Sequence, residues 1–101
     1  MPPFFALILA AQKANNAVLV VDMRRTFALD VARDAGIDTE RLLVSMPDDD
    51  AQAAEIALGV VKSGVISLAV LLVDVDAADM AAALPDVRGA AQRTNTVLAF
   101  A

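Results

Sequence analysis

The fold of this chain is decided by one stretch, Ser67-Leu68-Ala69-Val70-Leu71-Leu72-Val73-Asp74-Val75-Asp76, which is apolar until it reaches two carboxylates. An apolar run of this length without a polar face is typical of a strand that is buried on both sides. Such a strand belongs in a parallel sheet covered by helices. Open α/β sheets usually bind ligands at the carboxyl edge of their strands. Asp74 and Asp76 are therefore candidates for a ligand cleft.

The rest of the chain alternates between helical and strand patterns. Helices are expected at residues 4–13, 26–35, 51–63 and 77–84 with a short turn at 87–93, and strands at 17–22, 42–45 and 96–101. Thr26 is the expected cap of the second helix, Asp49 with Gln52 that of the third, and Asp76 that of the fourth, which Pro85 should end. The face expected for the second helix is Phe27, Val31 and Ala35. Strands that alternate with helices predict a parallel sheet with right-handed crossovers, in a single domain at 1–101.

Composition excludes several kinds of chemistry. The 101 residues contain no cysteine and no histidine, so a disulfide, a thiolate metal site and a Ser-His-Asp or Cys-His mechanism are all excluded. The net charge is −5 and only Arg24 and Arg25 are adjacent cations, which argues against a nucleic-acid surface. No uncharged apolar run approaches the roughly 18 residues of a membrane span. We therefore expect no membrane partner and a cytoplasmic location.

The acidic run at residues 48–50 has two interpretations. Carboxylates suit the positive end of a helix dipole, and Asp49 followed by Gln52 resembles a capping box. The alternative is a cation site. The cap is the preferred interpretation, because adjacent side chains point in different directions and calcium loops need spaced ligands.

Short matches to a known family follow one another along the chain. They are residues 11–14 (Ala-Gln-Lys-Ala), 20–22 (Val-Val-Asp), 32–33 (Ala-Arg), 36–38 (Gly-Ile-Asp), 42–48 (Leu-Leu-Val-Ser-Met-Pro-Asp), 52–53 (Gln-Ala), 55–57 (Glu-Ile-Ala), 63–64 (Ser-Gly), 73–74 (Val-Asp) and 95–97 (Asn-Thr-Val). Because of these matches, the part of the chain from about Ala10 to Asp74, roughly two thirds of its length, resembles the core ATPase domain of the RecA recombinase family. The resemblance implies a RecA-like P-loop NTPase core without the P-loop strand: a small three-layer α/β fold whose open parallel sheet has about four strands in the order 2-1-3-4.

The same resemblance implies that the family's chemistry is missing. The phosphate-binding loop, G-x-x-x-x-G-K-[ST], should end just before the first helix, where Met1-Pro2-Pro3 stands. Arg24 occupies the place of the glutamate that activates water, and a guanidinium stays protonated. The glutamine that ends the next core strand of the family would lie past Ala101. We therefore expect no enzymatic activity, no catalytic residue and no cofactor.

Asp74 matches the aspartate at the end of the family's magnesium-positioning strand, the Walker B aspartate, and is the candidate metal ligand. A single carboxylate holds magnesium poorly without phosphates to share the ion. The alternative is a structural role, in which Asp74 caps the end of the strand or pairs with Arg24 or Arg25.

A candidate cleft lies where the strand order reverses, between the first and third strands. It would be lined by Asp22, Arg24, Arg25, Asp74 and Asp76. The two arginines could meet an anionic ligand, or they could neutralise the neighbouring aspartates. An anionic ligand would fit a second functional hypothesis, an ATP- and Mg²⁺-binding DNA-repair module of the RecA type whose missing phosphate loop comes from a partner chain.

The last strand supplies the first functional hypothesis. In the family the phosphate-loop strand would flank it, so its absence exposes the backbone of Thr96–Ala101, an apolar edge without protecting charge or proline. This edge predicts a homo-oligomer or a protein partner. We therefore expect a non-catalytic RecA-like domain that acts through protein interaction or self-association, or an engineered or pared-down core with no physiological activity. Relatives of RecA without ATPase chemistry, such as the SulA cell-division inhibitors, imply that the fold can persist without nucleotide chemistry.

Overall fold

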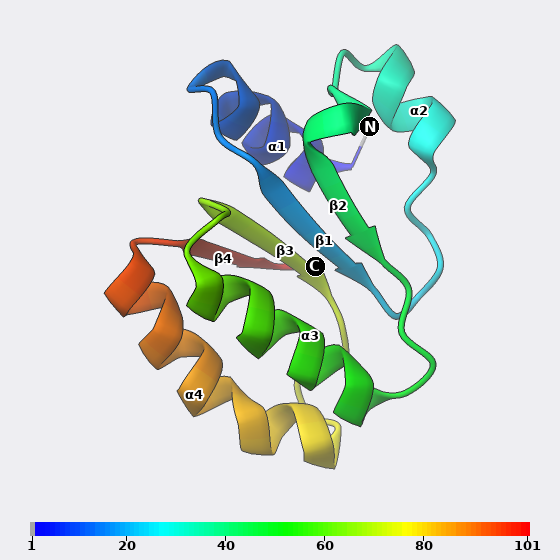
Figure 1. Ribbon diagram of the computed structural model, residues 1–101. Coiled ribbons are helices and arrows are strands. Elements are labelled where there is room, and N and C mark those ends of the chain that lie inside the picture. Colours follow the sequence, from blue (N-terminus) through cyan, green and yellow to red (C-terminus); the bar gives the residue numbers. More distant parts are fainter. Residues whose placement is uncertain (1) are drawn as a thin grey trace.

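The computed structural model describes residues 2–101 and places helices on both faces of a four-stranded sheet (Figure 1). The elements are α1 (Pro3–Lys13), β1 (Val18–Asp22), α2 (Leu29–Asp34), the 3₁₀ turn η1 (Thr39–Arg41), β2 (Leu42–Ser45), α3 (Asp50–Ser63), β3 (Leu68–Leu72), α4 (Ala78–Thr94) and β4 (Val97–Phe100). All strand pairs are parallel and the order is β2-β1-β3-β4. The predicted fold class and strand order are confirmed. Met1, part of the Met1-Pro2-Pro3 stretch expected in place of the phosphate-binding loop, lies outside the described residues.

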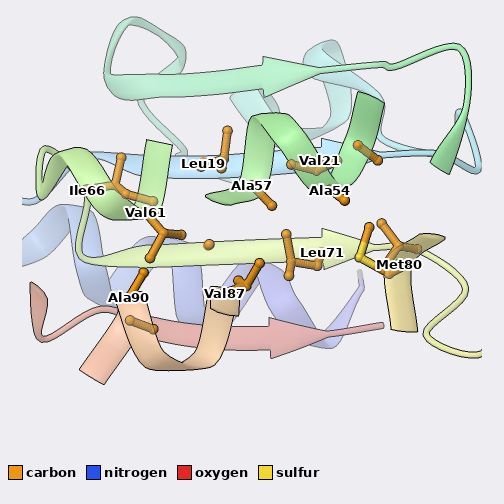
Figure 2. Packing of buried hydrophobic residues seen from close by; sticks show 14 residues of the cluster. Leu19, Val21, Ala54, Ala57, Val61, Ile66, Leu71, Met80, Val87 and Ala90 are labelled. Carbon is orange, nitrogen blue, oxygen red and sulfur yellow. The ribbon is translucent and has the colours of Figure 1, made fainter. Parts of the chain in front are cut away.

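The two central strands, β1 and β3, are buried at every position. Successive side chains of a strand point to opposite faces, so burial on both faces requires an apolar residue at each step. On one face Val61 of α3 and Met80 and Val87 of α4 pack against Leu19 and Leu71 (Figure 2). The other face is covered by α1 and α2. Its cluster consists of Phe5, Ile8, Val18, Val20, Ala32, Ile37, Leu42, Leu68, Val70 and Leu72.

Helix α3 begins and ends as its sequence predicts. The Asp49 side chain accepts a hydrogen bond from the Gln52 backbone N–H at 2.8 Å, and the Gln52 side chain accepts one from the Asp48 N–H at 2.8 Å. At the other end Gly64 adopts φ = 74°, a left-handed conformation that glycine reaches without steric cost. The acidic run at 48–50 therefore provides the helix cap.

Helix α4 corrects two predictions. Pro85 does not end the helix, which continues to Thr94, and the N-cap is Ala77 rather than Asp76. A proline removes the hydrogen bond to the carbonyl four residues earlier, here that of Ala81. Both residues are on the exposed side of α4, so water can reach that carbonyl. The opposite side is held by buried apolar residues on both sides of the proline, Met80 and Val87 among them.

Helix α2 is shorter than predicted. It begins at Leu29 without a side-chain cap, and Val31 on the expected apolar face is 49% exposed, whereas Ala32 is buried. Thr26 does not cap it, because the helix begins three residues later and its N-cap position belongs to Ala28. The Thr26 backbone N–H instead donates to the Asp22 carboxylate, within the loop that precedes the helix. Phe27 lies before the helix and stacks on Phe4 with 6.2 Å between ring centroids.

Candidate functional site

Asp22, the last residue of β1, lies at the predicted cleft but faces inward. Its side chain is fully buried. One carboxylate oxygen accepts from the backbone N–H groups of Arg24 at 3.1 Å and Thr26 at 3.3 Å, and the other accepts from Phe27 at 2.9 Å. A carboxylate offers about four lone-pair sites. Most of the hydrogen-bond acceptor sites of Asp22 are thus used to hold the loop that follows β1.

Arg24 holds the carboxyl ends of two strands together. One of its guanidinium nitrogens donates to the Ala101 carbonyl and the other to the Val73 carbonyl, the latter at 3.2 Å. Arg24 therefore spans the residues that follow β3 and β4. It makes no ion pair with the cleft aspartates among the described residues.

Arg25 points the other way. Its backbone is left-handed, with φ = 55°, and its guanidinium donates to the Pro47 carbonyl at 3.4 Å. It lies 3.8 Å from the Asp48 carboxylate, and both of these side chains are largely exposed, so the pair contributes little to stability. Of the two alternatives for the arginines, neutralisation of the cleft aspartates through an ion pair is not seen among residues 2–101. Arg25 meets the acidic cap of α3 instead.

Asp74 and Asp76 are exposed in the loop after β3. The Asp74 side chain accepts from the Asp76 N–H at 3.0 Å and its carbonyl accepts from the Ala77 N–H at 3.2 Å, which is a local turn that aspartate commonly forms. Within residues 2–101 no group of three or more acidic side chains could surround a metal ion. A magnesium ion at Asp74 stays a prediction that would need further oxygen ligands from another molecule.

The predicted cleft residues therefore share one edge of the sheet without forming one site. Asp22 is buried and the two arginines bond to different parts of the chain, and of the three carboxylates only those of Asp74 and Asp76 face solvent. In the described part of the chain, no two of these charged side chains form an ion pair with each other.

A different feature stands out along β4. The N–H of Val97 donates to Ser67 at 2.9 Å and that of Ala101 to Leu71 at 3.3 Å, both toward β3. Because peptide groups alternate along a strand, those of Leu98 and Phe100 face away from β3. The strand order gives β4 no neighbour on that side within residues 2–101. This outer side of β4, residues 97–100, is called the β4 edge below.

Two hollows flank the β4 edge, one on each face of the sheet. Between α4 and β4 is a groove of about 530 Å³, and between α1 and β4 one of about 390 Å³. Val97 lines both and is 58% exposed. On the α4 side the Arg88 guanidinium lies 5.2 Å from the centroid of the Phe100 ring, a cation–π contact. The sequence indicated the edge through its unprotected apolar residues, but not the grooves, which depend on where the helices lie.

Residues 2–101 contain no helix that is both long enough and apolar enough to cross a membrane. The fold has a close match among solved structures. SulA from Pseudomonas aeruginosa superposes with a TM-score of 0.78, and the match covers 96% of this chain and 81% of that one at 16% sequence identity. At that identity the likeness concerns the fold alone.

Sequence comparison gives a closer relation. Protein RecA from Corynebacterium diphtheriae and from Clostridium botulinum are each 44% identical to this chain over 64 residues, and Protein RecA from Nocardioides sp. is 41% identical over 61. These matches cover 63%, 63% and 60% of this chain but only 17% of each RecA protein. The family model of the RecA N-terminal domain matches residues 4–98, nearly all of the sequence. The chain therefore belongs to the RecA N-terminal domain family.

Proposed function

We propose that this chain is a non-catalytic member of the family that acts by associating with protein through the β4 edge. The observation that carries the proposal is the edge itself: Leu98 and Phe100 direct their peptide groups away from the sheet, and a groove lies on either side. A row of unsatisfied strand groups is a template for another strand. Strand addition supplies affinity through main-chain hydrogen bonds, and the flanking grooves supply side-chain selectivity.

The state of the predicted cleft supports the non-catalytic part of the proposal. Arg24 stands where the resemblance implies a glutamate, and it is engaged with two carbonyls. Asp22 is engaged with three backbone N–H groups. The 101 residues contain no G-x-x-x-x-G-K-[ST] sequence. A nucleotide would thus have to displace existing contacts and find its phosphate ligands on another chain.

The test combines calorimetry with light scattering on one sample. ATP with magnesium is titrated into the protein, and the mass is measured at two protein concentrations. We expect no heat of binding and a mass that rises above the monomer at the higher concentration. Binding tighter than about 100 μM, which corresponds to about 5.5 kcal/mol, would overturn the non-catalytic interpretation and favour a nucleotide module completed by a partner chain.

If a heat of binding does appear, a matched variant shows whether it depends on Asp74. Asp74→Ala removes the exposed carboxylate that corresponds to the family's magnesium-positioning residue. If the heat disappears with this variant, nucleotide binding runs through Asp74. A monomer at both concentrations would contradict self-association, and a pull-down with no bound protein would then contradict the interaction proposal as a whole.

A further inference from the structure

The β4 edge lies between two grooves of different chemistry. Helices α1 and α4 lie on opposite faces of the sheet (Figure 1), and each borders one groove. Five of the eight residues that line the groove on the α1 side are apolar, including the exposed Leu7 and Val97. Four of the seven residues that line the groove on the α4 side are polar, among them Arg88 and Gln92, and none is acidic. The two grooves therefore select different side chains.

A strand added to the β4 edge would turn successive side chains toward opposite grooves. The strand β4 itself does so. Leu98 and Phe100 pack on the cluster beneath α4, whereas Ala99 packs on the cluster beneath α1. An added strand continues the same sheet and keeps these two faces. Every second side chain of the added strand would thus meet the apolar groove, and the side chains between would meet Arg88 and Gln92.

Arg88 is the charged group that such a strand would meet. It is exposed on α4, and its guanidinium lies 5.2 Å from the centroid of the Phe100 ring. This cation–π contact with the last residue of β4 holds the guanidinium beside the edge. Within residues 2–101 Arg88 has no ion-pair partner. A guanidinium has five N–H donors and binds a carboxylate through two parallel hydrogen bonds, so an acidic side chain matches this position.

The strands of this chain do not alternate between apolar and acidic residues. The strands β2, β3 and β4 contain no charged residue, and β1 has only Asp22, which is buried at its end. Residues 73–76, Val-Asp-Val-Asp, do alternate, but there the Asp74 side chain accepts from the Asp76 N–H in a turn. A segment that fits both grooves is therefore to be sought in a different protein.

We propose that the β4 edge binds an extended segment of another protein in which apolar residues alternate with aspartate or glutamate. The apolar residues face the α1 side and a carboxylate pairs with Arg88. The inference rests on the proposed function and names the chemical class of the partner for the same edge. A basic segment would place like charges beside Arg88, and an entirely apolar segment would cover the guanidinium without pairing it.

Three synthetic peptides of about eight residues, a length typical of a strand, test this pattern. Each has valine at every second position, and the positions between hold glutamate, glutamine or lysine. Each peptide carries a fluorescent label and is kept dilute while the protein is titrated, and fluorescence anisotropy measures its Kd. The buffer contains about 0.15 M salt, where the Debye length is about 8 Å, so the net charge of the protein is largely screened but a direct contact is not.

We expect the glutamate peptide to bind about fivefold more tightly than the glutamine peptide, and the lysine peptide to bind most weakly. The net charge of −5 alone would favour the reverse order. Arg88→Glu should invert the order. Arg93→Glu is the matched control, because it changes the net charge equally on the same helix but lies outside the groove. This control should keep the order of wild type.

A proline variant tests whether the peptides bind at the edge strand. The Leu98 N–H faces away from β3, so Leu98→Pro removes an outward donor without removing a hydrogen bond of the sheet. We expect all three peptides to lose binding, and circular dichroism checks that the variant is folded. If it fails to fold, the inversion by Arg88→Glu still decides whether the peptides contact the groove on the α4 side.

An order of affinities that stays the same in Arg88→Glu would overturn the inference, while loss of binding in Leu98→Pro would leave the proposed function standing. Absence of binding by every peptide up to about 1 mM would also overturn the inference, and the light scattering and pull-down described above would then decide the proposed function separately. A second copy as the occupant would overturn it as well. Wild type would then be a dimer at the assay concentration, Leu98→Pro would be a monomer, and the glutamate peptide would not bind.

Discussion

Asp22 and Asp74 follow similar apolar runs on neighbouring strands, Asp22 as the last residue of β1 and Asp74 in the loop after β3, yet their surroundings are opposite. Asp22 is fully buried and accepts three backbone hydrogen bonds, whereas Asp74 is exposed and accepts one from its own loop. The difference lies in the backbone that follows. After Asp22 the chain curls over the strand end toward Phe27, but after Asp74 it leads directly into α4. A carboxylate at a strand end is thus made structural or available by the loop behind it.

The largest effect is expected when Asp22 is removed. Asp22→Ala leaves three backbone N–H groups without their acceptor, so the free energy of unfolding should fall by about 3 kcal/mol. Urea denaturation followed by circular dichroism measures the change. Asp22→Asn keeps one acceptor oxygen and should fall between the alanine variant and wild type. A loss below about 1 kcal/mol for the alanine variant would contradict a structural role for this carboxylate.

A smaller effect is expected at the cap of α3. Asp49→Ala removes the acceptor for the Gln52 N–H, and the loss of such a cap typically costs about 1 kcal/mol. Asp50→Ala is the control, since Asp50 contributes chiefly through the helix dipole, worth a few tenths of a kcal/mol on an exposed helix. Equal losses in the same urea titration would show that the acidic run stabilises α3 through charge and not through the Asp49 hydrogen bond.

The smallest effect is expected at Asp74. Asp74→Ala removes a single exposed side-chain acceptor, so stability should change by no more than about 0.5 kcal/mol. Asp76→Ala should behave similarly, because the cap position of α4 belongs to Ala77. If Asp74→Ala proved as destabilising as Asp22→Ala, the contrast between the two strand ends would fail.

The sequence predicted the strands well because a strand that is buried on both faces needs an apolar residue at every position. The runs that end at Asp22 and Asp74 have no polar residue, which fits only a covered parallel strand. Helix limits were harder. Thr26 has the residue type of a cap, but the buried Asp22 carboxylate binds the loop that contains it, and the helix begins only at Leu29. Pro85 has the residue type of a helix end, but the exposure of Ala81 makes a missing hydrogen bond tolerable there. Both outcomes depend on the tertiary structure, which a local rule does not contain.

The sequence predicted which residues lie near one another at the candidate site, but not how their side chains are arranged. The five cleft residues do lie at the carboxyl edge, as their positions after parallel strands require. Arg24 and Arg25 nevertheless diverge, and Arg24 reaches the carbonyl of a residue 77 positions along the chain. A long flexible side chain has many rotamers, and its choice of partner depends on contacts that no sequence pattern records. The β4 edge was easier to predict, because it follows from the strand order and from the absence of charge in the strand.

The all-parallel sheet also determines how this chain can fold. Val18 pairs with Leu68, fifty residues further along, and Leu68 pairs with Val97, so no strand pair closes through a hairpin. Each pairing requires closure of a long loop, which slows folding relative to chains with local contacts. During synthesis β1 emerges well before its central neighbour β3 exists. Until the second half has been made, a nascent chain therefore lacks β3, the strand that covers one side of the β1 run.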